Sequence, residues 1–199
     1  MKKLIVYVLS VISLVSCNNS KIIEEAECSC PHATIILQPY GKFSKAEVNK
    51  ILPLLQENLN EYTYGSWEYK ILDPISITLE KTKNNRYRAG DFLISQYKRI
   101  HNSSEIIIGL THEDICTNRH NIENYGILGY SFKPGQVCII SDKRLSNKND
   151  IWKVIFHEFM HAYYGVDHCP NDDPKCFMKD AKGHGNIRIQ NKLCNSCRQ

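Results

Sequence analysis

Apolar residues recur along the chain with two spacings, and these predict strands and helices in alternation. Short apolar runs bounded by turn residues predict buried strands at 33–38 and 105–110, the second of them central. Apolar residues at helical spacing predict a helix over 44–59. This helix starts at a capping box, and Pro53 is expected to kink or divide it.

The remaining periodic segments predict two pairs of strands and another helix. Apolar and β-branched residues predict strands at 68–72 and 75–79, and again at 126–132 and 136–141, each pair joined by a turn. Asp91 is expected to cap a helix. The apolar residues of that helix that partly line one side are Phe92, Ile94, Tyr97 and Ile100.

The first 17 residues have a basic start and a short apolar run, which together predict an export signal. The run is too short for a membrane span. Its end, Leu14-Val15-Ser16-Cys17, resembles a bacterial lipoprotein signal in which Cys17 receives lipid; an ordinary secretory peptide is the alternative. Residues 18–31 are polar and predict a tether, and 32–199 predict one domain. We therefore expect an exported protein, anchored by lipid to a membrane of the cell envelope.

The charge of the chain indicates no particular binding partner. The formal net charge is +4 over 199 residues, without a block of lysine and arginine or an alternation of arginine with aromatic residues. We interpret the charge as a solvated surface and expect no nucleic-acid partner. We expect the protein to be a monomer.

The segment around His157 carries the clearest chemical signal. On a helix of about 3.6 residues per turn, His157 and His161 lie on the same face, so both imidazoles can reach one metal ion. Glu158 follows the first histidine directly, where its carboxylate can accept a proton from a water at the metal. This HExxH spacing is typical of zinc hydrolases, and a pair of surface histidines is the alternative interpretation.

The flanking residues support a helix through this motif. Asn149 or Asp150 is suited to the N-cap, and a core-facing stripe is formed by Ile151, Ile155 and Phe159. Gly165 can adopt positive φ and end the helix, which lets the chain turn back and bring His168 under the metal as a third ligand.

From this motif onward the sequence resembles the archaemetzincins, a family of zinc peptidases within the metzincins. The matching residues, in chain order, are His157, Glu158, His161, Gly165, His168, Cys169, Cys176, Met178, Cys194 and Cys197. The resemblance covers nearly all of the chain after the signal, although only its C-terminal third carries a specific motif. It implies an α+β, zincin-like fold with a mixed sheet, an active-site helix and a cysteine-rich C-terminal subdomain.

The spacing departs from the family pattern at the third ligand. Three residues separate His161 from Gly165, one more than in the pattern, so strict counting places Asp167 at the third ligand position. We favour His168, because it preserves the steps Gly-x-x-His and His-Cys, while Asp167 stays open as an oxygen ligand. The stretch from Cys169 to Cys176 is also longer than the pattern, and the stretch before the final CxxC is shorter.

The resemblance implies a zinc metallopeptidase acting on peptides or proteins. His157, His161 and His168 would hold the catalytic zinc, with Glu158 as general base. In zincins an edge strand lies above the metal and can receive an extended peptide. The alternative is a catalytically silent envelope protein that keeps the zinc fold for structure or partner binding.

Nine cysteines are many for this length, and eight remain after Cys17 is assigned to lipid. Four thiolates can close a structural zinc site, and the family holds a second zinc with its matching cysteines, Cys169, Cys176, Cys194 and Cys197; two disulfides are the alternative. A disulfide between Cys116 and Cys138 is also predicted, whereas Cys28 and Cys30 are left unassigned. Met178 resembles the methionine that forms an apolar floor beneath the catalytic metal, and its burial is expected.

Overall fold

The computed structural model describes residues 32–119, 121–181 and 187–198. The predicted signal, the tether and the cysteines at 17, 28 and 30 lie outside the described residues. No helix in the described ranges is long and apolar enough to span a membrane.

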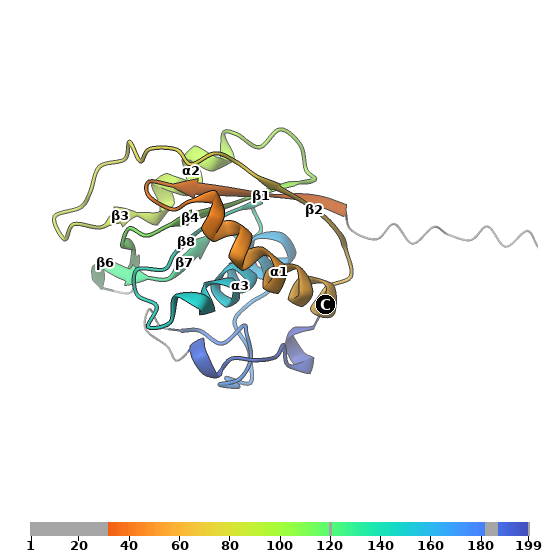
Figure 1. Ribbon diagram of the computed structural model, residues 1–199. Helices are drawn as coiled ribbons and strands as arrows, with labels where there is room; N and C mark the ends of the chain where they lie inside the picture. Colours follow the sequence, from red (N-terminus) through yellow and green to blue (C-terminus); the bar gives the residue numbers. More distant parts are fainter. Residues whose placement is uncertain (1–31, 120, 182–186, 199) are drawn as a thin grey trace, which may run out of the picture.

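A mixed five-stranded sheet forms the centre of the domain, as predicted (Figure 1). Its strands, in spatial order, are β2 (Ser66–Ile71), β1 (His32–Tyr40), β4 (Glu105–Thr111), β8 (Val137–Ser141) and β7 (Gly129–Ser131). The first four are parallel, and β7 pairs antiparallel with β8 at the edge. The prediction that 105–110 is a central strand is confirmed, because β4 lies between β1 and β8.

Helices cover both faces of this sheet (Figure 1). α1 (Lys45–Tyr62) and α3 (Ile151–Tyr164) pack on one face, and α2 (Ala89–Tyr97) packs on the other. Because side chains alternate along a strand, β4 serves both layers: Ile106 and Ile108 contact the α1/α3 core, while Ile107 contacts the α2 core. A strand buried on both faces reads as an unbroken apolar run, which is why β4 was predictable.

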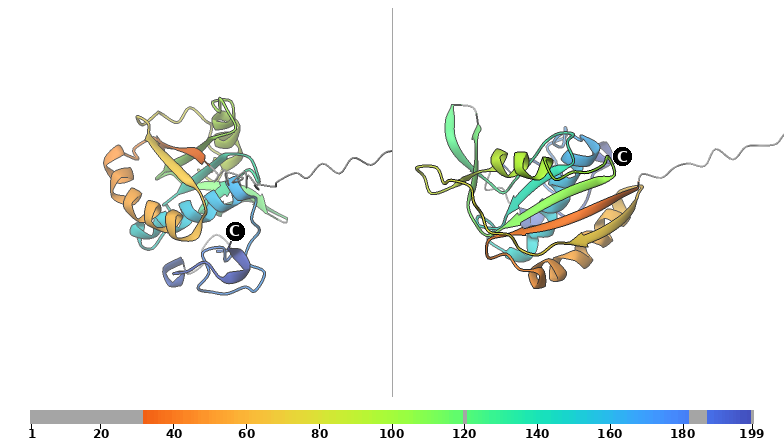
Figure 2. Two further views of the ribbon diagram at one scale, coloured as in Figure 1. Left: turned by 90° about the vertical axis from the view of Figure 1, so that its right-hand side faces the viewer. Right: turned by 90° about the horizontal axis from the view of Figure 1, so that it is seen from above.

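A smaller sheet lies beside the main one and was not predicted as such. Its strands are β3 (Tyr87–Arg88), β5 (Ile115–Arg119) and β6 (Ile122–Ile127), and Figure 2 shows the β5–β6 hairpin projecting from the body. The single strand predicted at 126–132 is therefore wrong. β6 ends at Ile127 with β5 as its partner, and β7 begins at Gly129 with β8 as its partner. The chain changes sheets at Leu128.

Three local predictions about the remaining elements also need correction. The segment 75–79 forms no strand: Ile75 makes one isolated bridge with Tyr40, although Ile77 and Leu79 still pack against the α2 core. Asp91 lies in the first turn of α2 and is not its cap. Ile94 and Tyr97 of that helix are 51% and 55% exposed, so they do not line the core.

The capping box that begins α1 is present, as predicted. The Ser44 backbone amide donates to Glu47 Oε2 at 2.9 Å, and the Glu47 amide donates to Ser44 Oγ at 3.3 Å. α1 then continues through Pro53 as one helix, so it is not divided there. Beyond α3, the C-terminal segment lies beside the helices and away from the sheet (Figure 2).

Candidate metal centre

His157 and His161 lie on α3, and both line a cavity of the domain. The helix begins after Asp150, and Ile151, Ile155 and Phe159 are at most 2% exposed, as their spacing predicted. It ends at Gly165, whose φ of 65° places it in the left-handed region, so the chain can reverse directly after the helix.

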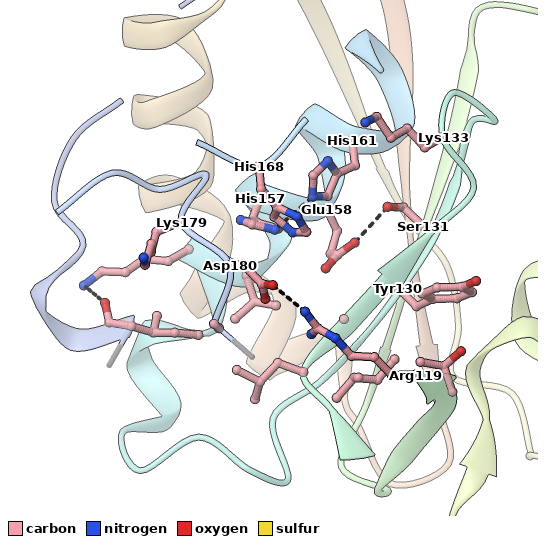
Figure 3. A pocket seen from close by; sticks show the side chains of 18 of the residues that line it. Arg119, Tyr130, Ser131, Lys133, His157, Glu158, His161, His168, Lys179 and Asp180 are labelled. Atoms are coloured by element: carbon pink, nitrogen blue, oxygen red, sulfur yellow. Dashed lines mark hydrogen bonds and ion pairs between the residues drawn. The ribbon is translucent and has the colours of Figure 1, made fainter. Parts of the chain in front are cut away.

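Three histidines converge as a result of this reversal (Figure 3). His157 and His161 project from one face of α3, and His168 returns from the following loop; one ligand atom from each lies within 4.8 Å of the others. Asp167, the alternative third residue, is not part of this group. Its side chain is 91% exposed and forms an ion pair with Lys133. The extra residue between His161 and Gly165 is thus accommodated in the last turn of α3, and His168 still lies with the other two histidines.

The hydrogen bonds of the two helical histidines leave their Nε2 atoms available to a metal. Nδ1 of His157 lies 2.7 Å from the Phe177 carbonyl oxygen, and Nδ1 of His161 lies 2.5 Å from the Val166 carbonyl oxygen. Each carbonyl can accept only from an Nδ1–H, which makes the Nε2 atom the lone-pair donor. The two Nε2 atoms are 3.0 Å apart. Tetrahedral zinc with bonds of about 2.0–2.1 Å needs a separation of about 3.3 Å.

Burial keeps these imidazoles in the neutral form that binds metal. It lowers the pKa of His157 to about 3 and that of His161 to about 4, and the neighbouring histidines contribute in the same direction. Both rings are therefore neutral at pH 7 even without a metal. In donor type, separation and protonation state, the three histidines fit a zinc ion with a position left for water.

Glu158 lies beside this cluster without belonging to it. It is 7% exposed, and its Oε2 accepts a hydrogen bond from Ser131 Oγ at 2.8 Å. Burial raises the pKa of Glu158 to about 7, while the Ser131 hydrogen bond acts in the opposite direction. Gly129 gives the carboxylate its space, because a Cβ at this position would lie 2.6 Å from Glu158 Oε1. The site thus holds a buried carboxylate suited to accept a proton.

A cavity of about 440 Å³ opens over the histidines and Glu158. One wall is formed by β7, the last strand of the main sheet within the described ranges. The backbones of Leu128 and Phe132 hydrogen-bond to β8. Along an antiparallel strand, successive residues direct their backbone groups alternately toward and away from the partner strand, so those of Gly129 and Ser131 point away from β8. These groups face the open edge, where an extended chain can pair with them.

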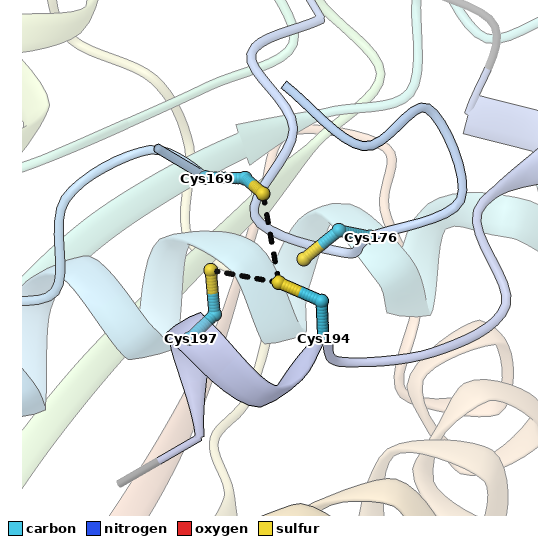
Figure 4. A group of neighbouring side chains, drawn as sticks. All are labelled: Cys169, Cys176, Cys194 and Cys197. Carbon is cyan, nitrogen blue, oxygen red and sulfur yellow. Dashed lines mark hydrogen bonds between the residues drawn. The ribbon is translucent and has the colours of Figure 1, made fainter. Parts of the chain in front are cut away.

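Four cysteines form a second group (Figure 4). The sulfur atoms of Cys169, Cys176, Cys194 and Cys197 all lie within 4.8 Å of one another. Two of the sulfur separations are 3.6 Å, between Cys169 and Cys194, and 3.5 Å, between Cys194 and Cys197. A tetrahedral zinc–thiolate site with bonds of about 2.3 Å requires about 3.8 Å, whereas a disulfide requires about 2.05 Å.

The chemistry of these thiols also suits a metal. All four are free cysteines, so the two disulfides considered as an alternative are not formed. Burial raises the pKa of Cys176 to about 11 and raises that of Cys197 further. A cation bound here would displace these protons and compensate the buried charge.

The disulfide predicted between Cys116 and Cys138 is wrong. Both are free: Cys116 lies in the small sheet, with its Sγ 3.5 Å from the Tyr87 carbonyl oxygen, and Cys138 lies within β8 of the main sheet. Met178 is fully buried, as expected, and its carbonyl oxygen accepts from the Cys169 amide at 2.8 Å. This hydrogen bond connects the loop that carries His168 and Cys169 to the segment that carries Met178.

Several residues that line the cavity were not predicted from the sequence. Gly129 and Ser131 lay within a predicted strand, but nothing in the sequence indicated that they face Glu158. Arg119 and Asp180 lie 61 residues apart and form an ion pair in the cavity wall, Nη2 to Oδ2, at 2.6 Å. A pair so distant in sequence leaves no local signal.

Comparison with solved structures places the domain in a known fold. The archaemetzincin of Methanopyrus kandleri is 22% identical with a TM-score of 0.67, covering 84% of this chain and 92% of that one. The Archaeoglobus fulgidus archaemetzincin, complexed with malonate, is 20% identical (TM-score 0.64; 82% and 97% covered). A zinc-dependent peptidase from Methanocorpusculum labreanum is 19% identical (TM-score 0.60; 81% and 97% covered).

These likenesses confirm the predicted resemblance at the level of the fold. No protein-family model and no curated protein matches the chain. At identities near 20%, the comparisons establish the archaemetzincin-like architecture alone, because one fold can carry many functions.

Proposed function

We propose that this protein is a zinc-dependent metallopeptidase. The observation that carries the proposal is the convergence of the three histidines beside Glu158, a buried carboxylate that is not part of the ligand group. A purely structural zinc site has no need of such a carboxylate, which argues against the catalytically silent alternative. The shared fold with two archaemetzincins and a zinc-dependent peptidase supports the same activity.

Zinc bound by His157, His161 and His168 would supply Lewis-acid activation of the attacking water and of the scissile carbonyl. Glu158 accepts the proton of that water and returns it to the leaving amine. Ser131 holds the Glu158 carboxylate through the 2.8 Å hydrogen bond, and the carbonyls of Phe177 and Val166 fix the two helical imidazoles. Each of these contacts orients a group before substrate arrives.

A peptide substrate would bind as an added strand on β7. Gly129 and Ser131 line the cavity together with Glu158 and the histidines, so pairing with their outward backbone groups would bring a peptide bond over the histidines. Main-chain pairing of this kind is independent of side-chain identity. It therefore explains binding, while specificity must come from the cavity walls.

A second zinc, held by Cys169, Cys176, Cys194 and Cys197, would have a structural role. Cys169 directly follows His168, and Cys176 precedes Met178 by two residues, so this site would fix both segments relative to α3. Attachment to a membrane of the cell envelope through Cys17 is also part of the proposal, and it rests on the N-terminal sequence alone.

The experiment that tests the proposal compares zinc-loaded wild type with Glu158→Gln in a peptide-library digest read by mass spectrometry. The variant keeps all three ligands, so we expect full zinc content with hydrolysis reduced by about 10²-fold or more. Glu57→Gln, at an exposed position of α1, is the matched control and should cleave like wild type. A Glu158→Gln enzyme with the wild-type rate would refute the mechanism.

A further inference from the structure

Arg119 provides the cavity with a cationic side chain that the proposed mechanism does not use. It lies at the end of β5, and its guanidinium reaches across the cavity wall to Asp180 (Figure 3). The described hydrogen bond to Asp180 uses only Nη2, and the side chain is 33% exposed. A guanidinium has five N–H donors in a planar fork, so donors remain for a second carboxylate.

The two ends of the cavity differ in their lining. The turn after β7 lies at the C-terminal end of α3, because the Gly135 amide donates to the Ala162 carbonyl oxygen at 3.0 Å; Lys133 and Asp167 line that end. The opposite end is lined by Val154, from the N-terminal half of α3. Figure 3 shows Arg119 at the end of the site away from Lys133, with Ser131 between them.

These positions determine which part of a substrate meets Arg119. β7 runs from Gly129 to Ser131 and on toward Lys133. A peptide pairing antiparallel with β7, the slightly more stable arrangement, runs in the opposite direction. Its amino-terminal part then lies toward Lys133, and its carboxyl-terminal part lies toward Arg119.

The cationic residues that line the cavity differ in where their ion-pair partners lie. Besides Lys133, the cationic residues of the described lining are Arg119, Lys153 and Lys179, and Asp180 is anionic. The lysines are paired with acids outside the lining, Lys153 with Asp150 at 3.0 Å and Lys179 with Asp172. Of these three cations, Arg119 is the one whose described ion-pair partner lies in the cavity lining.

We propose that Arg119 binds a carboxylate on the carboxyl-terminal side of the scissile bond, and so determines specificity. The carboxylate comes from an acidic side chain or from the free C-terminus of the substrate. Asp180 holds the guanidinium at the cavity wall and leaves its other donors for the substrate. This inference rests on the proposed peptidase function and names its substrate class.

The test uses three fluorogenic peptides of one sequence. The first has glutamine after the scissile bond and a C-terminal amide, the second replaces this glutamine by glutamate, and the third keeps glutamine but ends in a free carboxylate. We expect zinc-loaded wild type to show a kcat/KM about tenfold or more higher for one or both carboxylate peptides than for the neutral one. Preference for the second peptide identifies a side chain as the source, and preference for the third identifies the C-terminus.

Substitutions of Arg119 test whether its guanidinium causes this preference for a carboxylate peptide. Arg119→Gln should bring the ratio of carboxylate to neutral peptide close to about 1, and Arg119→Lys, which keeps the charge but not the fork, should retain part of it. Arg88→Gln, an exposed arginine of β3 outside the cavity lining, is the matched control and should keep the wild-type ratio. Equal kcat/KM for all three peptides in wild type would overturn the proposal. So would an Arg119→Gln variant that loses activity on all three in equal proportion, because Arg119 would then only support the wall.

A binding measurement separates this inference from the peptidase proposal. Fluorescence anisotropy with zinc-loaded Glu158→Gln reports affinity for the same peptides without turnover. If wild type hydrolyses none of them, the peptidase proposal fails, while tighter binding of a carboxylate peptide that depends on Arg119 still supports this inference. Equal affinities for all three peptides would overturn it.

Discussion

Removal of the Ser131 hydroxyl should shift the pH dependence of the proposed peptidase activity. Ser131 Oγ donates to Glu158 Oε2 at 2.8 Å, and a hydrogen bond to a carboxylate stabilises its ionised form. In Ser131→Ala the pKa of Glu158 therefore rises. Since the protonated carboxyl cannot act as a base, activity should be lost at a higher pH than in wild type as the solution is acidified.

The size of the shift follows from the burial of the pair. Glu158 is 7% exposed, so bulk water does not screen the contact, and a hydrogen bond to a charged group contributes about 1.5–3 kcal/mol. One pH unit corresponds to about 1.4 kcal/mol, so the acid limb of the kcat/KM profile should move up by about one to two pH units. A bound zinc cation lowers the pKa of Glu158 in both enzymes and leaves the direction of this difference unchanged.

The assay is the pH profile of kcat/KM for zinc-loaded enzyme on one fluorogenic peptide. Ser131→Thr keeps a hydroxyl and should restore the wild-type profile, and Ser95→Ala, at an exposed position of α2, controls for the substitution itself. Zinc content measured on each sample excludes metal loss as the cause. An acid limb that does not move in Ser131→Ala would refute the role assigned to this hydrogen bond.

Three further predictions concern the metals and the anchor. His168→Ala should weaken binding of the catalytic zinc by about 100-fold or more in a chelator competition, whereas Asp167→Ala should change it by less than about threefold; the reverse order would make Asp167 the ligand. Cys194→Ala should reduce bound zinc from two ions to one per chain by elemental analysis and lower the Tm by on the order of 10 °C, and an unchanged zinc content would exclude the cysteine site. Cys17→Ser should move the protein from the membrane to the soluble fraction, and membrane retention of this variant would exclude lipidation.

Much of helix α3 could be predicted because its determinants are local. The i, i+4 spacing of His157 and His161 fixes their common face, and Gly165 marks the end of the helix. The buried strand β4 was predictable for a similar reason, since burial on both faces leaves an unbroken apolar run. The resemblance to archaemetzincins depended on these same residues and on the cysteines that follow.

The errors lie where local signals depend on a distant partner. The stretch 126–132 reads as one strand in the sequence, yet it divides at Leu128 because β5 pairs with the first part and β8 with the second. Cys116 and Cys138 lie close enough in sequence to suggest a disulfide, but the chain places them in different sheets.

The sequence by itself predicted the proposed donor set, namely the side chains that would bind zinc and the carboxylate that would serve as a base. Only the tertiary structure shows that His168, and not Asp167, lies with the other two histidines, because this depends on how the loop after Gly165 folds back onto α3. It also brought Ser131 to Glu158. Such contacts join segments that are far apart in the chain. Their geometry is set by the packing of the sheet against the helices, and this packing cannot be predicted from a local pattern of residues.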